Sequence, residues 1–412
     1  MGVAAAFELS WRRLRENAQH LGCLLSLFAL APIPWELVEG ITINNEAQDW
    51  KKARRDLLQL HLLQPKGKGI YQLHPLLREF FQGKLTGLEQ AEDFKRSFCR
   101  VMVAVAKNMP DAPTLQQIQD VAPAIPHLAE VANNLIKYIS DKDLILPFCS
   151  LGRFYECQGL YEQAETWRKQ CLDFAQNYFG LEHPQVAISI NNMALLYDEQ
   201  GRYDEAELLY YQALEIYQNL QEEDDHYTIA TILNNLALLY NEQDRYTDAE
   251  FLFKQALEKL QRLPGKEHYQ ALCLINLGLL YKYQKNYKKA ENLYYQALKV
   301  MQGLWGEEHP DIALCLNNLA CLYDCQGNYK EAKLLHDQTL AMRQRLLGDE
   351  HLDAADSLNN LGLHYYSQGQ YKEAEPLFLK ALQIREYRLG LSHPDTVDTI
   401  ENLADLRDRL NS

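Results

Sequence analysis

The sequence predicts an all-α fold that consists mainly of about six stacked helix-turn-helix repeats. A pentapeptide of the form aromatic–x–x–Ala–acid recurs at steps of 42, 43, 41, 42 and 42 residues, and the fifth copy ends in lysine in place of glutamate. The copies begin at Tyr161, Tyr203, Tyr246, Tyr287, Tyr329 and Tyr371. An asparagine recurs with the same period at Asn192, Asn235, Asn276, Asn318, Asn360 and Asn402. A fixed period of this length is typical of supersecondary units that stack on one another, in contrast to a single globular core.

Residues 185–220 show how one repeat is built. Gly201 is expected to end the first helix in a left-handed conformation, and Asp204 is expected to cap the second helix. The first helix carries apolar residues at i, i+3, i+4 and i+7, which lie on one face: Ile190, Met193, Ala194 and Tyr197. The second helix keeps the same spacing with Ala206, Leu209, Tyr210, Ala213, Leu214 and Tyr217. One such hairpin cannot bury its second face alone, so the neighbouring repeats must cover it.

The pattern resembles the tetratricopeptide repeat (TPR), whose usual period is 34 residues. The longer period is similar to that of kinesin light chains, because eight extra residues add about one turn to each helix. The matching segments are Leu316–Tyr323, Gln326–Ala332, Gly306–Pro310 and Gly390–Pro394. The resemblance implies a right-handed TPR superhelix over residues 147–412, with six 42-residue repeats and the last helix as a cap.

Residues 1–86 lack the period and predict a small winged-helix-like domain, followed by a helical connector or cap over residues 87–146. We expect a helix over Lys51–Leu63, a hairpin turn at residues 67–69, a short strand, and a helix from Pro75. The segments Leu21–Trp35, Leu57–Gln64 and Tyr71–Phe81 resemble the winged helix of NB-ARC (STAND) signal-transduction ATPases.

In the ATPase family, a Met-His-Asp motif senses the bound nucleotide. His74 matches its histidine, but Leu73 and Pro75 replace the other two residues, so we expect His74 to be an ordinary packing residue. The sequence contains no Gly-x-x-x-x-Gly-Lys-Ser/Thr phosphate loop, and we therefore expect neither ATP binding nor hydrolysis.

Charge and cysteine content limit the classes of partner. Residues 1–140 carry a net charge of +2 and the remainder −17, so the repeats should repel nucleic acid. The nine cysteines form no C-x-x-C pair, as expected for free, buried thiols in a reducing cytoplasm. The apolar run Leu21–Ala31 is too short to span a membrane and is interpreted as a buried helix.

No catalytic constellation, cofactor site or metal site is expected. Histidines recur between the repeats, at His183, His226, His268, His309, His351 and His393. Because each lies one repeat away from the next, these side chains cannot gather around a metal ion, and a structural role is expected. Proline follows three of them, at a position where a helix tolerates its missing N–H.

The asparagines of the first helices are the candidate peptide-binding residues. Asparagine is a mediocre helix former, so its recurrence within helices needs a reason. One alternative is that each amide ties neighbouring repeats together. The other follows from the TPR resemblance, which implies that Asn192, Asn235, Asn276, Asn318 and Asn360 line a concave groove and hold a peptide backbone or carboxylate through their amides.

Three positions further along each helix, apolar side chains are expected to line the same groove. They are Leu195, Leu238 and Leu279, followed by Cys321 and Leu363, and Lys282 is a basic residue beside them. The neighbouring Asp198, Glu199, Glu242 and Asp324 make this surface unlike the basic groove of kinesin light chains. A ligand of mixed or basic charge with spaced apolar anchors is therefore expected.

The sequence leaves two main hypotheses for function. The first is a non-enzymatic adaptor that binds a protein or peptide in the concave groove. The second is the ligand-sensing half of a larger STAND ATPase, which implies an upstream nucleotide-binding domain. A motor light chain is a weaker third interpretation, because no sustained heptad repeat is present.

Overall fold

The computed structural model describes residues 3–43, 46–47, 50–110, 113, 115–220, 226–261, 263–391 and 393–411. These residues form two compact units. The N-terminal unit comprises Met1–Asp111 and Gln117–Leu151, and the repeat unit comprises Ala112–Gln116 and Gly152–Ser412. Most of residues 87–146 thus belong to the same unit as residues 1–86. The three-part boundaries at residues 86 and 146 stay a prediction.

The N-terminal unit combines helices with two small antiparallel sheets, one in the order β1-β5-β4 and the other formed by β2 and β3. Its elements are α1 (Val3–Arg13), α2 (Glu16–Leu25), β1 (Ile33–Pro34), α3 (Trp35–Glu39), β2 (Thr42–Ile43), β3 (Glu46–Ala47), α4 (Lys51–Gln59), β4 (Gln64–Gly67), β5 (Ile70–Gln72), α5 (Pro75–Leu85), α6 (Ala91–Lys107), α7 (Leu115–Val121) and α8 (Ile125–Glu130). Ile33 pairs with Tyr71 across the first sheet. The expected hairpin and the helix from Pro75 are confirmed, while the winged-helix assignment stays a prediction.

Two details of this unit differ from expectation. Helix α4 ends at Gln59 instead of continuing to Leu63, because His61 adopts a positive φ of 52° that turns the chain. Leu62 and Leu63 beyond the turn are nevertheless buried. His74 is exposed and caps α5, since its Nδ1 accepts a hydrogen bond from the backbone N–H of Leu76 at 3.3 Å. Its role is helix capping and not packing.

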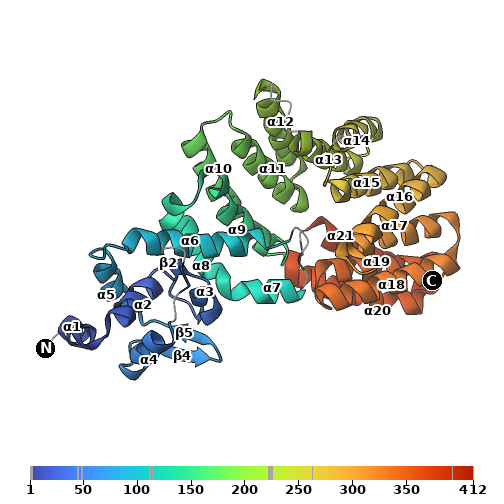
Figure 1. Ribbon diagram of the computed structural model, residues 1–412. Helices are drawn as coiled ribbons and strands as arrows, with labels where there is room; N and C mark the ends of the chain where they lie inside the picture. The colour runs from blue at the N-terminus through green and yellow to red at the C-terminus, as the bar shows by residue number, and fades with distance from the viewer. Residues whose placement is uncertain are drawn as a thin grey trace. The chain divides into compact units, whose positions relative to one another are not determined.

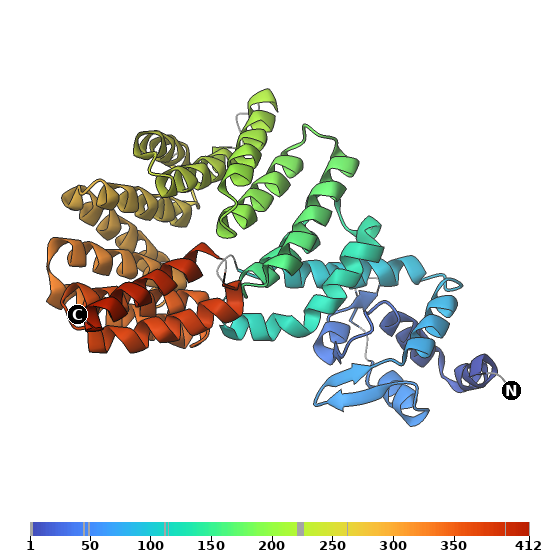
Figure 2. The same cartoon turned by 180° about the vertical axis from the view of Figure 1, so that it is seen from behind.

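The repeat unit consists of successive antiparallel helix pairs (Figure 1). The first helices are α9 (Leu146–Glu156), α11 (Pro184–Glu199), α13 (His226–Glu242), α15 (Glu267–Tyr283), α17 (Pro310–Gln326) and α19 (Leu352–Ser367), and α21 (Pro394–Asn411) follows the last pair. Helix α9 begins in the N-terminal unit and enters the repeat unit at Gly152. The second helices are α10 (Tyr161–Phe179), α12 (Tyr203–Leu220), α14 (Tyr246–Leu260), α16 (Tyr287–Trp305), α18 (Tyr329–Leu347) and α20 (Tyr371–Leu389). The view from behind shows the same pairing (Figure 2). The predicted all-α repeat fold is confirmed.

The pentapeptide marks the start of every second helix, since each begins at its tyrosine. The alanine three residues later is fully buried in all six copies: Ala164, Ala206, Ala249, Ala290, Ala332 and Ala374. A methyl group at this position lets the two helices of a pair approach closely. Gly201 has the expected positive φ of 73°. Asp204 is not the cap that was expected, because α12 already begins at Tyr203 and Asp204 lies in its first turn, where a carboxylate favours the positive end of the helix dipole.

The described helices include none that is both long enough and apolar enough to cross a bilayer.

Candidate functional site

The first helices of successive pairs contact one another. Each of α11, α13, α15, α17 and α19 carries one apolar side chain at the same repeat position, and together these side chains form a row. Leu195, Leu238 and Leu279 are half-buried, as is Cys321, and Leu363 is 37% exposed. The leucines that follow the first three directly, Leu196, Leu239 and Leu280, are fully buried. The row therefore lies at the surface edge of the core, where a ligand can reach it.

The asparagines beside this row form hydrogen bonds from repeat to repeat. Nδ2 of Asn235 donates to Oδ1 of Asn191 at 3.2 Å, and Nδ2 of Asn276 donates to Oδ1 of Asn234 at 3.1 Å. Nδ2 of Asn360 donates in the same way to Oδ1 of Asn317 at 3.2 Å. These amides tie neighbouring first helices together. Binding of a ligand by Asn235, Asn276 and Asn360 stays a prediction.

Asn318 differs from Asn235, Asn276 and Asn360, and the sequence of the preceding repeat explains the difference. Ile275 occupies the place of the acceptor asparagine, so Asn318 has no amide to bond across the repeat boundary. Its Nδ2 instead donates to the backbone oxygen of Leu314 in its own helix, at 3.1 Å. We call this series of amide bonds the asparagine ladder. Each of its bonds requires the second asparagine of one repeat and the first asparagine of the preceding repeat.

Acidic groups gather at the C-terminal ends of α11 and α13. The surrounding protein removes hydration from Asp198 and raises its pKa to about 7, with a smaller contribution from the charge of Glu242. The pKa of Glu199 is raised to about 8, first by lost hydration and then by nearby Glu156. Lost hydration also raises the pKa of Glu242. A cationic group placed here would relieve this repulsion.

The C-terminal end of α20 and the residue before α21 contact the first repeats, so the two ends of the repeat unit meet (Figures 1 and 2). Nη1 of Arg388 donates to the backbone oxygen of Gln158, and Nε2 of His393 donates to the backbone oxygen of Glu199. The ring of His393 also stacks on Tyr161, with the ring centroids 6.2 Å apart. The acidic groups of α11 therefore lie next to a contact between the first and last repeats.

Four of the six recurring histidines act as helix caps, in agreement with the structural role that was expected. In four of them Nδ1 accepts a hydrogen bond from the backbone N–H two residues later, at 3.1–3.2 Å: His183, His309, His351 and His393. Pro184, Pro310 and Pro394 occupy the first helical position after three of these caps.

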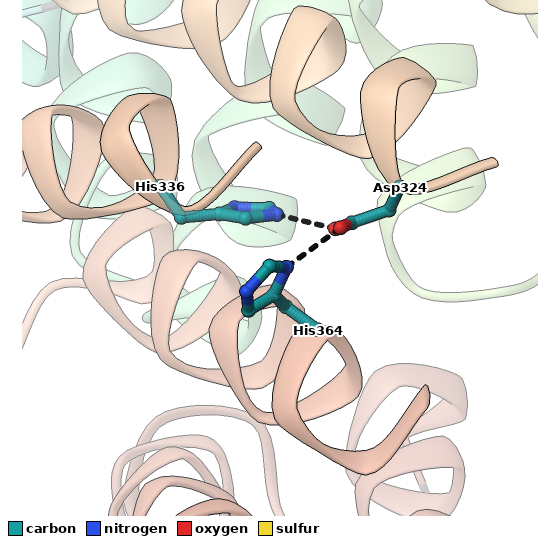
Figure 3. Close-up of side chains that lie close together, drawn as sticks. All are labelled: Asp324, His336 and His364. Carbon is teal, nitrogen blue, oxygen red and sulfur yellow. Dashed lines mark hydrogen bonds and ion pairs between the residues drawn. The ribbon is translucent and has the colours of Figure 1, made fainter. Parts of the chain in front are cut away.

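Sequence reasoning missed a polar cluster in the fifth repeat, formed by Asp324, His336 and His364 (Figure 3). The three side chains come from α17, α18 and α19. The signal that could have revealed it is the appearance of two histidines at positions that are leucine or aromatic in most other repeats.

Comparisons with known proteins agree with the repeat architecture. The sequence profile described as Tetratricopeptide repeat matches residues 144–219, 228–303, 283–345, 335–387 and 353–412. No curated protein sequence matches the chain.

Three solved structures represent the similar folds. BtubC (BKLC) from P. vanneervenii is 27% identical, with a TM-score of 0.43, over 57% of this chain and 94% of that one. A STAND protein with a tetratricopeptide repeat sensor, PH0952 from Pyrococcus horikoshii, is 17% identical, with a TM-score of 0.50, over 100% of this chain but only 63% of that one. A Rap protein complexed with Competence and Sporulation Factor is 15% identical, with a TM-score of 0.51, over 82% of this chain and 92% of that one. Because the family profile covers more than half of the sequence, the chain belongs to the tetratricopeptide repeat family.

Proposed function

We propose that the repeat unit is an adaptor that binds a peptide or a helix of a partner protein along the surface of its first helices. Repeats of this family form protein-interaction scaffolds, and their fold is typically non-catalytic. The observation that carries the proposal is the row Leu195, Leu238, Leu279, Cys321 and Leu363, which recurs once per repeat at the surface edge of the core. Apolar side chains spaced in this way suit a ligand with apolar anchors at regular intervals.

The charge beside the row favours a ligand with basic groups. Asp198 resists ionisation because protein surrounds its carboxyl group, and a neighbouring cation would favour its charged form. Lys282 is the basic residue further along the row, so an anionic group at the opposite end of the ligand would complement it. The half-buried amides of Asn276 and Asn360 are well placed to bond a ligand backbone through their oxygens, to which none of the described groups donates a hydrogen bond.

The first prediction concerns this surface. Peptides are selected from a random displayed library on the immobilised protein, and their Kd is measured by fluorescence anisotropy. We expect Leu238→Asp to weaken binding by about 2 kcal/mol or more, a roughly 30-fold rise in Kd, because it puts a charge among the apolar anchors. The selected peptides should carry basic residues.

The matched control is Leu208→Asp, which places the same charge on a leucine of α12 that is 60% exposed. Binding of the selected peptide should be unchanged in that variant. Equal losses in both variants, or none in either, would place the ligand elsewhere and contradict the proposal. Selection of acidic peptides would contradict the charge preference alone.

A second candidate function is the sensing half of a STAND ATPase. It is favoured by one observation, namely that the Pyrococcus horikoshii STAND fold aligns with the whole of this chain, across both units. The chain spans less than two thirds of that protein. Sequencing of the reading frame upstream of Met1 tests the idea, because the ATPase hypothesis requires a phosphate-binding loop there.

A further inference from the structure

One buried cluster of three side chains includes Asp324, an acid beside the proposed peptide surface. Oδ2 of Asp324 is 2.8 Å from Nε2 of His336, and Oδ1 of Asp324 is 2.6 Å from Nδ1 of His364 (Figure 3). The side chains of both histidines are only 1% exposed, and that of Asp324 is 18% exposed. One carboxylate thus lies between two imidazoles inside the packed repeats.

The other repeats show what these two histidine positions normally hold. The position of His364 is a fully buried leucine in α11, α13, α15, α17 and α21, namely Leu196, Leu239, Leu280, Leu322 and Leu406, and it is the buried Phe154 in α9. The position of His336 is a fully buried aromatic residue in four other second helices, namely Tyr210, Phe253, Tyr294 and Phe378. The fold therefore requires histidine at neither position. Burying a polar ring in place of an apolar side chain costs free energy unless the ring is paired, so their joint presence next to a carboxylate needs its own explanation.

The first repeat provides an internal comparison. Glu156 and Arg168 occupy the positions of Asp324 and His336, and they form an ion pair in which Nε of Arg168 lies 2.7 Å from Oε1 of Glu156. The third position of that set is Leu196. Two polar residues are thus enough for a structural pair, and only the set with Asp324 adds a third polar group.

We propose that Asp324, His336 and His364 bind a divalent transition-metal ion, with Zn²⁺ as the ion to test. The candidate ligand atoms all lie within 4.8 Å of one another. Two ligand atoms that each lie about 2.0–2.2 Å from one tetrahedral ion are roughly 3.3–3.6 Å apart, so small shifts of the imidazoles from their present positions are enough. Two imidazoles and one carboxylate suit zinc, and other first-row ions accept the same set. The fourth position is left for water.

Each imidazole can coordinate as a neutral ring. The N–H proton that now faces Asp324 moves to the other ring nitrogen, so no net charge is gained or lost by the rings. For His364 that nitrogen is Nε2, which lies 2.8 Å from the side-chain amide of Gln368. With the amide turned over, its oxygen accepts the Nε2–H, as outer partners of metal-bound histidines commonly do.

The site has a route to solvent and bridges two repeats. His364 lines a surface hollow together with Tyr329, Lys333 and Tyr365, which gives an ion access. The ligands come from α17 and α18 of one pair and from α19 of the next. A bound ion would therefore link two neighbouring repeats and stabilise their stacking.

The second prediction tests this site in the full chain after removal of metal with a chelator. Zinc should bind with a stoichiometry of one per chain in a competition titration with a fluorescent zinc chelator, and it should raise the Tm. His364→Leu and His336→Phe each install a residue that other repeats carry at the same position, so both variants should fold. Each variant should raise the zinc Kd by more than about 100-fold. Loss of a residue that only hydrogen-bonds to a metal ligand weakens binding by up to about 100-fold, and loss of the ligand itself should cost more.

Asp324→Asn should weaken zinc binding to a similar extent, and Asp198→Asn is its matched control. Asp198 occupies the same repeat position, but Tyr210 and Leu239 take the places of the histidines. The control should keep the wild-type zinc Kd and the same rise in Tm with zinc. Failure of the wild-type chain to bind zinc would overturn the proposal and leave a structural hydrogen-bond cluster. Unchanged zinc affinity in His364→Leu and His336→Phe would also overturn it, since binding would then be at other histidines.

Discussion

At the scale of single residues, a residue that differs from its counterparts in other repeats can still make a favourable contact with the neighbouring repeat. The acid of the pentapeptide accepts a hydrogen bond from a tyrosine of the following repeat, as in Tyr281 to Glu250 at 3.0 Å. The fifth copy has Lys333 instead, and the lysine ammonium lies 5.5 Å from the ring centroid of Tyr365. A cation over an aromatic ring is also attractive, so the tyrosine keeps a favourable neighbour. The exchange of acid for lysine thus preserves the contact between repeats in another form.

The acidic residues at the end of α11 lead to the third prediction. The folded pKa values of Glu199 (about 8) and Asp198 (about 7) lie above their ordinary values of 4.5 and 3.8. Their contribution to stability is therefore fully present at low pH and is lost as the pH rises through 7 and 8. We expect the Tm to fall between pH 5 and about pH 8.5, and to fall less in the double variant Asp198→Asn with Glu199→Gln. An exposed control is Glu162→Gln, and a double variant with the same pH slope as this control would contradict the prediction.

At the scale of elements, the sequence predicted where the helices lie better than which side chains bond between them. The tyrosine of each pentapeptide marks the first residue of a second helix, because local spacing and the buried alanine decide where the pair closes. The amide bond from Asn235 to Asn191 could not be assigned, because it depends on the register between two helices of different repeats. The same limit applied to the histidines of α18 and α19, which no short motif brings together.

The asparagine ladder gives the fourth prediction. Asn235→Ala should lower the free energy of unfolding by about 1–3 kcal/mol, because it leaves the buried amide of Asn191 without its donor. Asn318→Ala should cost less, about 0.5–1.5 kcal/mol, since Leu314 keeps its place in the helix and no second side chain loses a partner. Urea denaturation followed by circular dichroism measures both. Equal losses would show that the bond between repeats adds nothing beyond an ordinary helix contact.

At the scale of the whole repeat unit, the contact between its ends could not be predicted from the sequence. The bond from Arg388 to Gln158 joins residues 230 positions apart. Whether such residues meet depends on the small rotation added by each repeat, which accumulates over the series. The period fixes the number of units but not this rotation. Two of the groups that make the contact, His393 and the backbone of Glu199, lie beside the acidic end of the proposed binding surface.

The fifth prediction concerns this contact. In the double variant Arg388→Ala with His393→Ala, the side-chain hydrogen bonds to Gln158 and Glu199 are lost, while the nearest-neighbour packing of each repeat remains. Amide hydrogen exchange should therefore accelerate in residues 156–161 and 388–391, with helix content nearly unchanged. The control is Arg345→Ala, an exposed arginine near the end of α18 that is paired with Glu308. Because solenoid repeats are stabilised mainly by their immediate neighbours, faster exchange spread over α13–α16 would show instead that the end contact supports the entire series.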